Sequence, residues 1–343
     1  MRMLPMACGA RLLYGSPRGE CPRRQVVMAV HLGAVSNQQP FVFEELERRG
    51  FVIHKVFQGK GWQDWARDLA PHAAEIRGVL SGGMTGLPKG LIDALPKLEI
   101  CAINGVGLET TDLPAAKARG VVVTTTPVLF DDVADLAIVL GMAACRRIAE
   151  ADRFVRAGKW LQGRMPLGRS FWGKRYGILG LGRIGQAVAR RLEGFGGSIG
   201  YFDPLPKTGL SWRAHASAVE LARESDILFL CAAGAPGGGV IVGREVLEAL
   251  GPQGVFVNIA RGWLVDEPAL VDLLAGGGLG AAGLDVFADE PTVPDRLLGL
   301  DNVVLTPHIA SSTQECMRRM GECVLANVTT WFAEGRAVTP VPM

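Results

Sequence analysis

Three polar residues follow apolar runs in the last third of the chain: Arg261 after VFVNIA, Glu290 after GLDVFAD and His308 after NVVLTP. Arginine can hold a carboxylate through two parallel hydrogen bonds and polarise a neighbouring carbonyl group. Histidine can deliver a proton near neutral pH, and a carboxylate beside it favours the imidazolium and orients the ring. These residue types suit a reaction in which a carbonyl oxygen gains charge and then a proton.

Each of the three residues also has a structural explanation. Arg261 could be a surface residue of the turn ARG, and Glu290 could simply precede the proline of ADEP. An isolated histidine at a strand end, such as His308, is more often structural than catalytic. If the apolar runs are parallel strands, however, all three side chains project from one edge of a sheet, where ligands bind. This convergence favours a catalytic site.

The elements before these residues form two alternating series. In the first, the strand candidates are QVVMAV, VIHKV, GVLS, LEICAI and VVVTT, and helical patterns FVFEELERR, LPKGLIDAL and DLPAAKAR lie between them. Such alternation predicts a parallel sheet with helices on its faces. A long helical pattern from Asp132 to about Gly158 follows and is apolar enough on one side to pack against something sizeable, for which a partner subunit is a candidate.

The second series predicts a six-stranded doubly wound sheet of the dinucleotide-binding type. Its strand candidates are RYGILG, SIGYFD, DILFLCA, VFVNI, GAAGLDV and NVVLT. Helical patterns separate most of them: RIGQAVARRLEGF, ASAVELARES, REVLEAL and DEPALVDLLAGG. A last helical pattern follows Thr313, beyond this unit, and could cross back to the first series.

A glycine-rich turn follows the first strand of the second series. GILGLGRIG places Gly180, Gly182 and Gly185 in the pattern G-x-G-x-x-G, directly before a helix. The first glycine permits the tight turn, the second lets the backbone approach a pyrophosphate, and the third lets helix and strand pack closely. The helix N-terminus adds free N–H groups for the phosphates. The context of strand, turn and helix makes this a strong signal in a chain with 45 glycines.

The next strand ends at Asp203, 18 residues after Gly185. A carboxylate there can accept hydrogen bonds from the adenosine ribose hydroxyls, and it repels a 2′-phosphate. We therefore expect NAD(H) as the favoured cofactor. Asp203 could instead merely begin the turn Asp-Pro, and Lys207 and Arg213 could still serve a phosphate, so NADP(H) stays open.

Composition describes an ordinary globular chain of 343 residues, 48% hydrophobic and 20% charged, with a formal charge of +2. There is no dense basic stripe and no apolar run of the roughly 18 residues that a membrane span needs, so we expect neither nucleic acid nor membrane as a partner. Seven cysteines form no C-x-x-C pattern, and their odd number favours reduced thiols in the cytoplasm.

We expect no catalytic role for the N-terminal segment or for four of the five histidines. Residues 1–25 are rich in arginine and proline, and we expect a disordered or targeting extension. The other four histidines lack a comparable arrangement, so we expect structural or surface roles and no metal site; these are His31, His54, His72 and His215.

Four motifs in this order, GLGRIGQAVARRL, VFVNIARGWLVDEPAL, GLDVFADEP and LTPHIAS, resemble the D-isomer-specific 2-hydroxyacid dehydrogenase family. The resemblance covers about residues 26–340 and is closest to the branch of glyoxylate/hydroxypyruvate and hydroxyphenylpyruvate reductases. It implies a Rossmann-type domain, residues 126–312, and a discontinuous flavodoxin-like substrate domain, residues 26–125 and 313–343. It also implies a homodimer built on residues 132–158.

The same resemblance implies NAD(P)H-dependent reduction of a small 2-oxo acid to a D-2-hydroxy acid. Arg261 would anchor the substrate carboxylate, Glu290 would set the protonation of His308, and His308 would donate the proton. Further substrate contacts are expected from Ser81, Gly82 and Gly83. We expect cofactor contacts from Gly180, Gly182, Arg183, Ile184, Gly185, Asp203, Cys231, Ala232, Ile259, Arg261, Asp285 and His308.

The chain departs from the family pattern at several positions. Thr125 stands where the family usually has asparagine, and Glu109 where aspartate is common; both are expected near the cleft. The loop CAAGAPGGG is also unusual and is expected to line the cofactor site. The branch often favours NADPH, which Asp203 opposes. An NADPH-preferring hydroxyphenylpyruvate reductase is therefore one alternative, and a cofactor-sensing interaction protein similar to the dehydrogenase-like corepressors is another.

Overall fold

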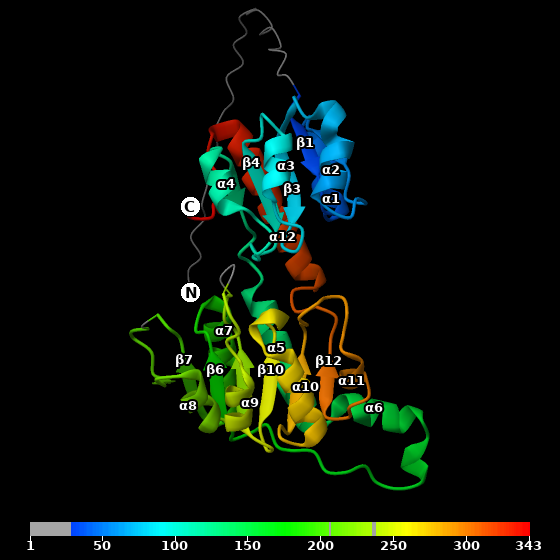
Figure 1. Cartoon of the computed structure of the whole chain (residues 1–343), viewed down its shortest axis with the longest axis vertical. Helices are drawn as coiled ribbons and strands as arrows, with labels where there is room; N and C mark the ends of the chain where they lie inside the picture. Colours follow the sequence, from blue (N-terminus) through cyan, green and yellow to red (C-terminus); the bar gives the residue numbers. More distant parts are fainter. Residues whose placement is uncertain (1–28, 206, 235–237) are drawn as a thin grey trace, which may run out of the picture.

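Two parallel β-sheets organise the chain, and helices cover both faces of each (Figure 1). The computed structural model describes residues 29–205, 207–234 and 238–343. The extension predicted for residues 1–25 lies outside the described residues, as do residues 25–28 of the first predicted strand and residues 235–237 of the loop CAAGAPGGG.

The first sheet has five strands in the order β2-β1-β3-β4-β5, and all neighbouring pairs are parallel. This is the flavodoxin-like order. The strands are β1 His31–Ala34, β2 Val52–Lys55, β3 Ile76–Gly82, β4 Ile100–Asn104 and β5 Val122–Thr124. The helices between them are α1 Pro40–Arg48, α2 Trp62–Leu69, α3 Lys89–Ala94 and α4 Leu113–Ala118, with a short 3-10 helix η1 at Ala70–His72.

Alternate residues of these strands enter two separate cores. Val79 and Ile103 pack with α2, α3 and α4 on one face, whereas Leu80 and Ala102 pack on the other face with α1 and with α12, Gln314–Glu334. Successive side chains of a strand point to opposite faces, so a sheet covered on both sides needs continuous apolar runs. That requirement explains the runs from which the strands were predicted.

The second sheet has seven parallel strands in the order β12-β11-β10-β9-β6-β7-β8. The strands are β6 Arg175–Leu179, β7 Ser198–Phe202, β8 Arg213–Ala214, β9 Ile227–Leu230, β10 Val255–Asn258, β11 Ala281–Leu284 and β12 Val303–Leu305. The order reverses between β6 and β9, as in dinucleotide-binding sheets. The predicted fold class, a doubly wound sheet beside a flavodoxin-like one, is confirmed.

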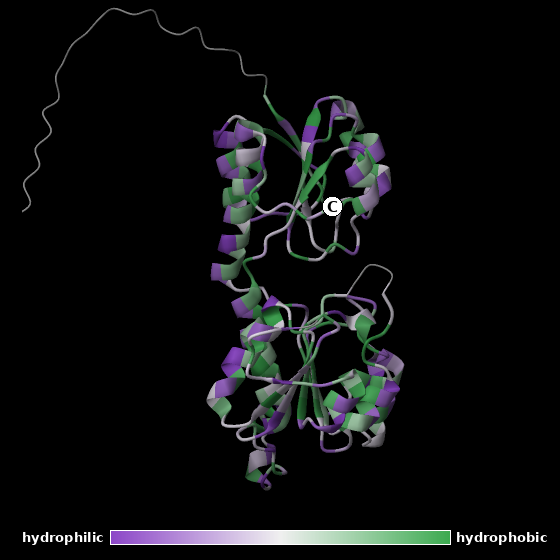
Figure 2. Ribbon diagram, turned by 90° about the vertical axis from the view of Figure 1, so that its left-hand side faces the viewer, coloured by the Kyte–Doolittle hydropathy of each residue, from purple (hydrophilic) through white to green (hydrophobic). Residues whose placement is uncertain are grey.

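Helices cover this sheet on both sides. The helices of this half are α5 Phe130–Arg146, α6 Ile148–Arg156, α7 Arg183–Leu192, α8 Ala218–Arg223, α9 Arg244–Leu250, α10 Glu267–Gly276 and α11 Asp295–Leu298, with 3-10 helices η2 Lys159–Leu161, η3 Glu193–Phe195 and η4 Gly262–Leu264. Helix α6 has no buried residue. Residues of α5 and α7 share one core, and those of α8, α9 and α10 share the other. Figure 2 shows the hydrophobic strands enclosed between helices that carry hydrophilic residues.

The structure corrects four expectations about these elements. The first strand begins at His31, one residue after QVVMAV ends, and helix α2 was not predicted. The helix expected from Asp132 to Gly158 is two helices, because Arg147 adopts a left-handed φ of 54° that ends α5 before α6 begins. The two-residue edge strand β8 makes the second sheet seven-stranded rather than six-stranded.

Helix α12 joins the two halves of the fold. Thr313 caps its N-terminus by accepting a hydrogen bond from the N–H of Cys316, and the Thr313 hydroxyl donates to Asp132 of α5 at 2.6 Å. The helix then runs across to the first sheet, where it packs beside β4 and α1 (Figure 1). The prediction that this helix crosses back to the first series is confirmed.

None of the helices in the described ranges is long and apolar enough to cross a membrane.

Candidate active site

A cavity of about 440 Å³ lies where the carboxyl ends of the two sheets meet. Gly83 and Asn104 reach it from the ends of β3 and β4, and Ile259, Phe287 and His308 reach it from the loops after β10, β11 and β12. Residues that follow parallel strands therefore line both walls. This is the position in which open α/β sheets bind ligands.

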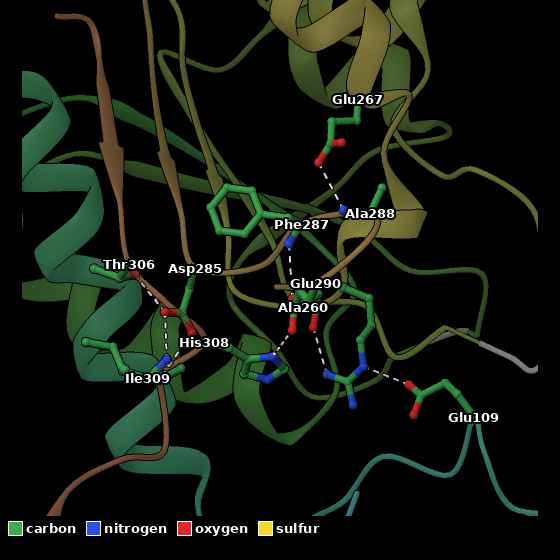
Figure 3. Close-up of polar contacts among 12 residues, drawn as sticks. Glu109, Ala260, Glu267, Asp285, Phe287, Ala288, Glu290, Thr306, His308 and Ile309 are labelled. Atoms are coloured by element: carbon green, nitrogen blue, oxygen red, sulfur yellow. Dashed lines mark hydrogen bonds and ion pairs between the residues drawn. The ribbon is translucent and has the colours of Figure 1, made fainter. Parts of the chain in front are cut away.

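His308 and Glu290 form a hydrogen-bonded pair in this cavity. The Nδ1 atom of His308 lies 2.7 Å from Oε2 of Glu290, and the two side chains are 35% and 16% exposed (Figure 3). The other carboxylate oxygen of Glu290 accepts the backbone N–H of Phe287 at 3.1 Å. Because Nδ1 is occupied and the ring orientation is set, the chemistry of the imidazole is left to Nε2.

The backbone holds His308 in a left-handed conformation, with φ of 52°. This region is unfavourable for residues other than glycine and persists where surrounding contacts enforce it. Asp285 supplies those contacts, because its carbonyl oxygen accepts the N–H of His308 and its buried carboxylate accepts the N–H groups of Ile309 and Ala310 and the hydroxyl of Thr306 (Figure 3). Asp285 thus fixes the loop that carries the histidine.

Arg261 makes an ion pair with Glu109 across the cavity. Its Nε atom donates to Oε1 of Glu109 at 2.8 Å, although the residues are 152 positions apart. Its Nη1 donates to the carbonyl oxygen of Ala260 (Figure 3). Asn258 Nδ2 donates to the Arg261 carbonyl oxygen. The guanidinium is therefore oriented from its own loop and from the opposite wall.

The glycine turn has the geometry that its pattern predicts. Gly180 has φ of 87°, and a Cβ there would lie 2.4 Å from the Cα of Ala232; a Cβ on Gly185 would lie 2.1 Å from the carbonyl oxygen of Gly180. Among the described residues, no heavy atom lies within 4 Å of a Cβ built on Gly182, which precedes α7 without a side-chain cap. The turn therefore leaves open backbone at a helix N-terminus, which fits a dinucleotide pyrophosphate.

Asp203 lies beside this turn. Its carboxylate accepts the N–H groups of Leu181 at 2.7 Å and Leu205 at 2.9 Å, and it pairs with Lys207 at 3.2 Å. Burial alone would raise the pKa of Asp203, but the two backbone hydrogen bonds and Lys207 outweigh it and lower the pKa below its ordinary value. The group is ionised at neutral pH, and Lys207 lies against it.

Of the other residues expected to contact the cofactor, some line the cavity and others do not. Ile184 and Ile259 line the cavity, Arg183 lies with its guanidinium over the Phe130 ring, and Ala232 packs against the turn. Cys231 is buried, which raises the pKa of its thiol to about 12. The contacts of these residues with a dinucleotide stay predictions. Asp285 is fully buried and does not line the cavity, so the contact it makes in this structure is with the His308 loop.

The expected substrate loop needs a correction. Strand β3 continues through Gly82, so Ser81 and Gly82 are buried strand residues, and the Ser81 hydroxyl donates to the carbonyl oxygen of Gly86. Only Gly83 of the three lines the cavity. Thr125 does not line the cavity either, and its carbonyl oxygen accepts the hydroxyl of Thr339 near the C-terminus.

Sequence reasoning missed Asn104. This residue ends β4 and lines the cavity, and its buried Oδ1 atom has no hydrogen-bond partner among the described residues. A buried polar atom without a partner is costly, so a ligand group that donates to Asn104 would be favourable. The signal was a polar residue directly after the apolar run ICAI, at a strand end.

Comparison with known proteins places these features in a family. A model described as the NAD binding domain of D-isomer specific 2-hydroxyacid dehydrogenases matches residues 138–310. A hydroxyphenylpyruvate reductase of Plectranthus scutellarioides is 47% identical over 302 residues, which cover 88% of this chain and 95% of that protein. A glyoxylate/hydroxypyruvate reductase of Arabidopsis thaliana is 45% identical and covers 80% and 88%, respectively.

The fold is also that of solved structures. An NADPH-dependent glyoxylate/hydroxypyruvate reductase of Sinorhizobium meliloti, in complex with NADP and malonate, superposes with a TM-score of 0.83 at 40% identity, covering 91% of this chain and 96% of that one. A 2-hydroxyacid dehydrogenase of Ketogulonicigenium vulgare gives 0.84 at 42% identity, covering 92% and 98%.

A dinucleotide-type sheet, a glycine turn and an arginine, glutamate and histidine set at one cleft define an oxidoreductase that uses a nicotinamide cofactor. The chain belongs to the D-isomer-specific 2-hydroxyacid dehydrogenase family. The two relatives named above are reductases of 2-oxo acids. The predicted family and enzyme class are confirmed.

Proposed function

We propose that this chain reduces glyoxylate, hydroxypyruvate or a similarly small 2-oxo acid to the D-2-hydroxy acid. The observation that carries the proposal is that Arg261 and the His308–Glu290 pair face one cavity, which Ile184 of the glycine turn also lines. In this proposal residues 126–312 bind the dinucleotide, and residues 26–125 with residues 313–343 complete the substrate side.

Each side chain then has a defined task. When bound, a reduced nicotinamide supplies a hydride to the carbonyl carbon. Arg261 holds the substrate carboxylate and polarises the adjacent carbonyl, and Nε2 of His308 donates a proton to the carbonyl oxygen. Glu290 orients the ring through its contact with Nδ1 and places a carboxylate beside the proton donor. Asn104 offers its side-chain amide at the opposite wall, beside Gly83, whose N–H donates to the Asn104 carbonyl oxygen at 3.3 Å.

The carboxylate of Asp203 supports NAD(H) as the preferred cofactor. Like charges repel strongly where water is partly excluded, and this ionised side chain is only 10% exposed. A specific observation favours the rival cofactor: Lys207 lies 3.2 Å from Asp203 and could neutralise it or turn to a 2′-phosphate. The relative from Sinorhizobium meliloti is NADPH-dependent, and the relative from Plectranthus scutellarioides is a hydroxyphenylpyruvate reductase.

One steady-state comparison tests both parts of the proposal. Purified chain is assayed with NADH and NADPH against glyoxylate, hydroxypyruvate and hydroxyphenylpyruvate. We expect the highest kcat/KM with NADH and a small acid. A strong preference for NADPH and hydroxyphenylpyruvate would replace the proposal with the rival reductase. Oxidation of neither cofactor with any acid would favour a cofactor-sensing interaction protein instead.

We also propose a homodimer through residues 132–158. Apolar side chains are exposed along α5 and α6, including Val139, Met142, Ile148 and Val155, and Leu161 just beyond is 95% exposed. Several exposed large apolar side chains on one segment support an interaction site there. Light scattering after size exclusion should give twice the mass of the 343-residue chain, and Ile148→Asp with Val155→Asp should give the monomer.

The compartment is inferred from thiol chemistry. Five cysteines are free in the part of the chain that the structure describes, and burial raises the pKa of Cys101, Cys145, Cys231 and Cys316. Free thiols in place of disulfides suit a reducing environment. We propose a cytoplasmic location, which fractionation of cells that express the full chain would test.

A further inference from the structure

Three of the four histidines without a catalytic role meet far from the cavity just described. His31 begins β1, His54 lies in β2, and His72 ends η1. One ring nitrogen from each lies within 4.8 Å of those of the other two. His31 stands at the amino-terminal end of its parallel strand, whereas the catalytic cavity lies at the carboxyl ends, so this cluster is separate from the reductase site.

Glu75 adds a carboxylate to the three imidazoles. Its Oε2 atom lies 3.2 Å from Nδ1 of His31 and 3.5 Å from Nδ1 of His72, and Nδ1 of His31 lies 3.1 Å from Nε2 of His54. Zinc binds imidazole nitrogen and carboxylate oxygen at about 2.0–2.2 Å in a tetrahedron, which puts neighbouring ligand atoms about 3.3 Å apart. Three of the six separations among these four groups bracket that value, and the three imidazoles form the set whose ligand atoms all lie within 4.8 Å of one another.

We propose that His31, His54, His72 and Glu75 form a zinc site that ties β1 and β2 to the turn before β3. Imidazole nitrogen and carboxylate oxygen are ligands that zinc accepts readily. Four protein ligands leave no open position for a substrate, so the site would stabilise the fold rather than catalyse a reaction. Strand β2 is an edge strand that pairs only with β1, so a metal that links it to β1 and to the turn before β3 would stabilise its position in the sheet.

The surroundings permit an ion to enter. Side chains of His31, His72 and Glu75 are 21%, 44% and 57% exposed. The rings of His54 and His72 stack with their centroids 3.9 Å apart. Because the lone pair of a ring nitrogen lies in the ring plane, these two rings must tilt apart to face one ion, and the exposed His72 side chain has room for that rotation.

Zinc binding by the tag-free, full-length chain tests the proposal. The protein is stripped with a chelator, titrated with zinc chloride alone and separated from unbound metal, and the bound zinc is measured by mass spectrometry. We expect about one zinc per chain and a higher Tm than for the stripped protein, because a metal that binds only the folded state stabilises it. His72→Asn should weaken zinc binding at least about tenfold and abolish the rise in Tm.

Two further variants make the result specific. His308→Asn removes the only histidine of the catalytic cavity and should bind zinc as the unaltered chain does. Glu75→Gln alters the most exposed of the four ligands, so we expect it to keep the fold even if His72→Asn unfolds. It should also weaken zinc binding. The reductase activity of His72→Asn should be unchanged, so failure of this proposal is distinguishable from failure of the proposed function.

The opposite results would overturn the site. Undiminished zinc binding by a folded His72→Asn or Glu75→Gln variant would show that other groups, such as Cys8 and Cys21, hold the metal. Loss of zinc from His308→Asn would assign it to the catalytic cavity. No zinc retained by the unaltered chain would also end the proposal.

Discussion

Nε of Arg261 lies 2.8 Å from Oε1 of Glu109, and this ion pair joins the loop after β10 to the loop after β4. The two side chains are 28% and 27% exposed, so water screens the pair only in part. Glu109 thus occupies one edge of the guanidinium that a substrate carboxylate would use. A substrate must displace this internal carboxylate or share the arginine with it.

The first prediction follows from that competition. Glu109→Gln should lower the KM for small 2-oxo acids about two- to fivefold, because a part-exposed ion pair is worth up to about 1 kcal/mol. The turnover number kcat should change less. Glu109→Asp is the matched control, since its shorter carboxylate keeps the charge and weakens only the contact. A higher KM in Glu109→Gln would show that the glutamate orients Arg261 for the substrate rather than competing with it.

The second prediction concerns the proton donor. His308→Gln should lower kcat by about 10²- to 10⁴-fold, the usual contribution of general acid catalysis. Binding of NADH, followed by quenching of protein fluorescence, should change little. Glu290→Gln should lower kcat by a smaller factor, because Nδ1 keeps an acceptor of similar shape but the imidazolium loses its counter-charge. Near-normal turnover of His308→Gln would remove this residue from the mechanism.

The third prediction concerns the cofactor. Asp203→Ser should shift the ratio of kcat/KM for NADPH over NADH upward by about tenfold, because the variant removes a carboxylate that would face a 2′-phosphate at close range. The single variant Lys207→Ala, which keeps Asp203, is the control, and it should lower the ratio of kcat/KM for NADPH over NADH. An unchanged ratio in both variants would mean that neither side chain contacts the adenosine ribose.

The fourth prediction concerns the loop that carries His308. Asp285→Asn should destabilise the fold by about 1–3 kcal/mol in urea unfolding, because the new amide N–H₂ meets backbone N–H groups that now donate to a carboxylate. Turnover should fall in parallel. Thr306→Val, which removes only the hydroxyl donor, should have a smaller effect on both. Full stability of Asp285→Asn would contradict the role assigned to this carboxylate.

The fifth prediction uses a glycine of the cavity wall. A Cβ on Gly107 would lie 2.6 Å from Nη2 of Arg261 and equally close to Oε2 of Glu109. Gly107→Ala should therefore displace the guanidinium and raise the KM for the 2-oxo acid without unfolding the chain. Gly163→Ala is the matched control, because no described heavy atom lies within 4 Å of the added methyl group, and its kinetics should match those of the unaltered chain.

The fold and the meeting of Arg261, Glu290 and His308 at one cavity could be predicted from the sequence because their signals are local. Buried parallel strands require continuous apolar runs, a pyrophosphate turn requires glycines at fixed spacing, and residues after parallel strands share one edge. The break between α5 and α6 could not be predicted in this way. The left-handed Arg147, with φ of 54°, has no glycine or proline beside it to mark the break.

The sequence by itself therefore determined the two sheets, the glycine turn with Asp203, and the edge on which Arg261, Glu290 and His308 lie. Only the tertiary structure decided that Glu109 meets Arg261, that Ser81 is a buried strand residue, and that three histidines and Glu75 converge. The physical reason is sequence separation. Contacts between distant segments depend on strand order, register and the approach of the two halves, and no periodicity along the chain encodes those relations.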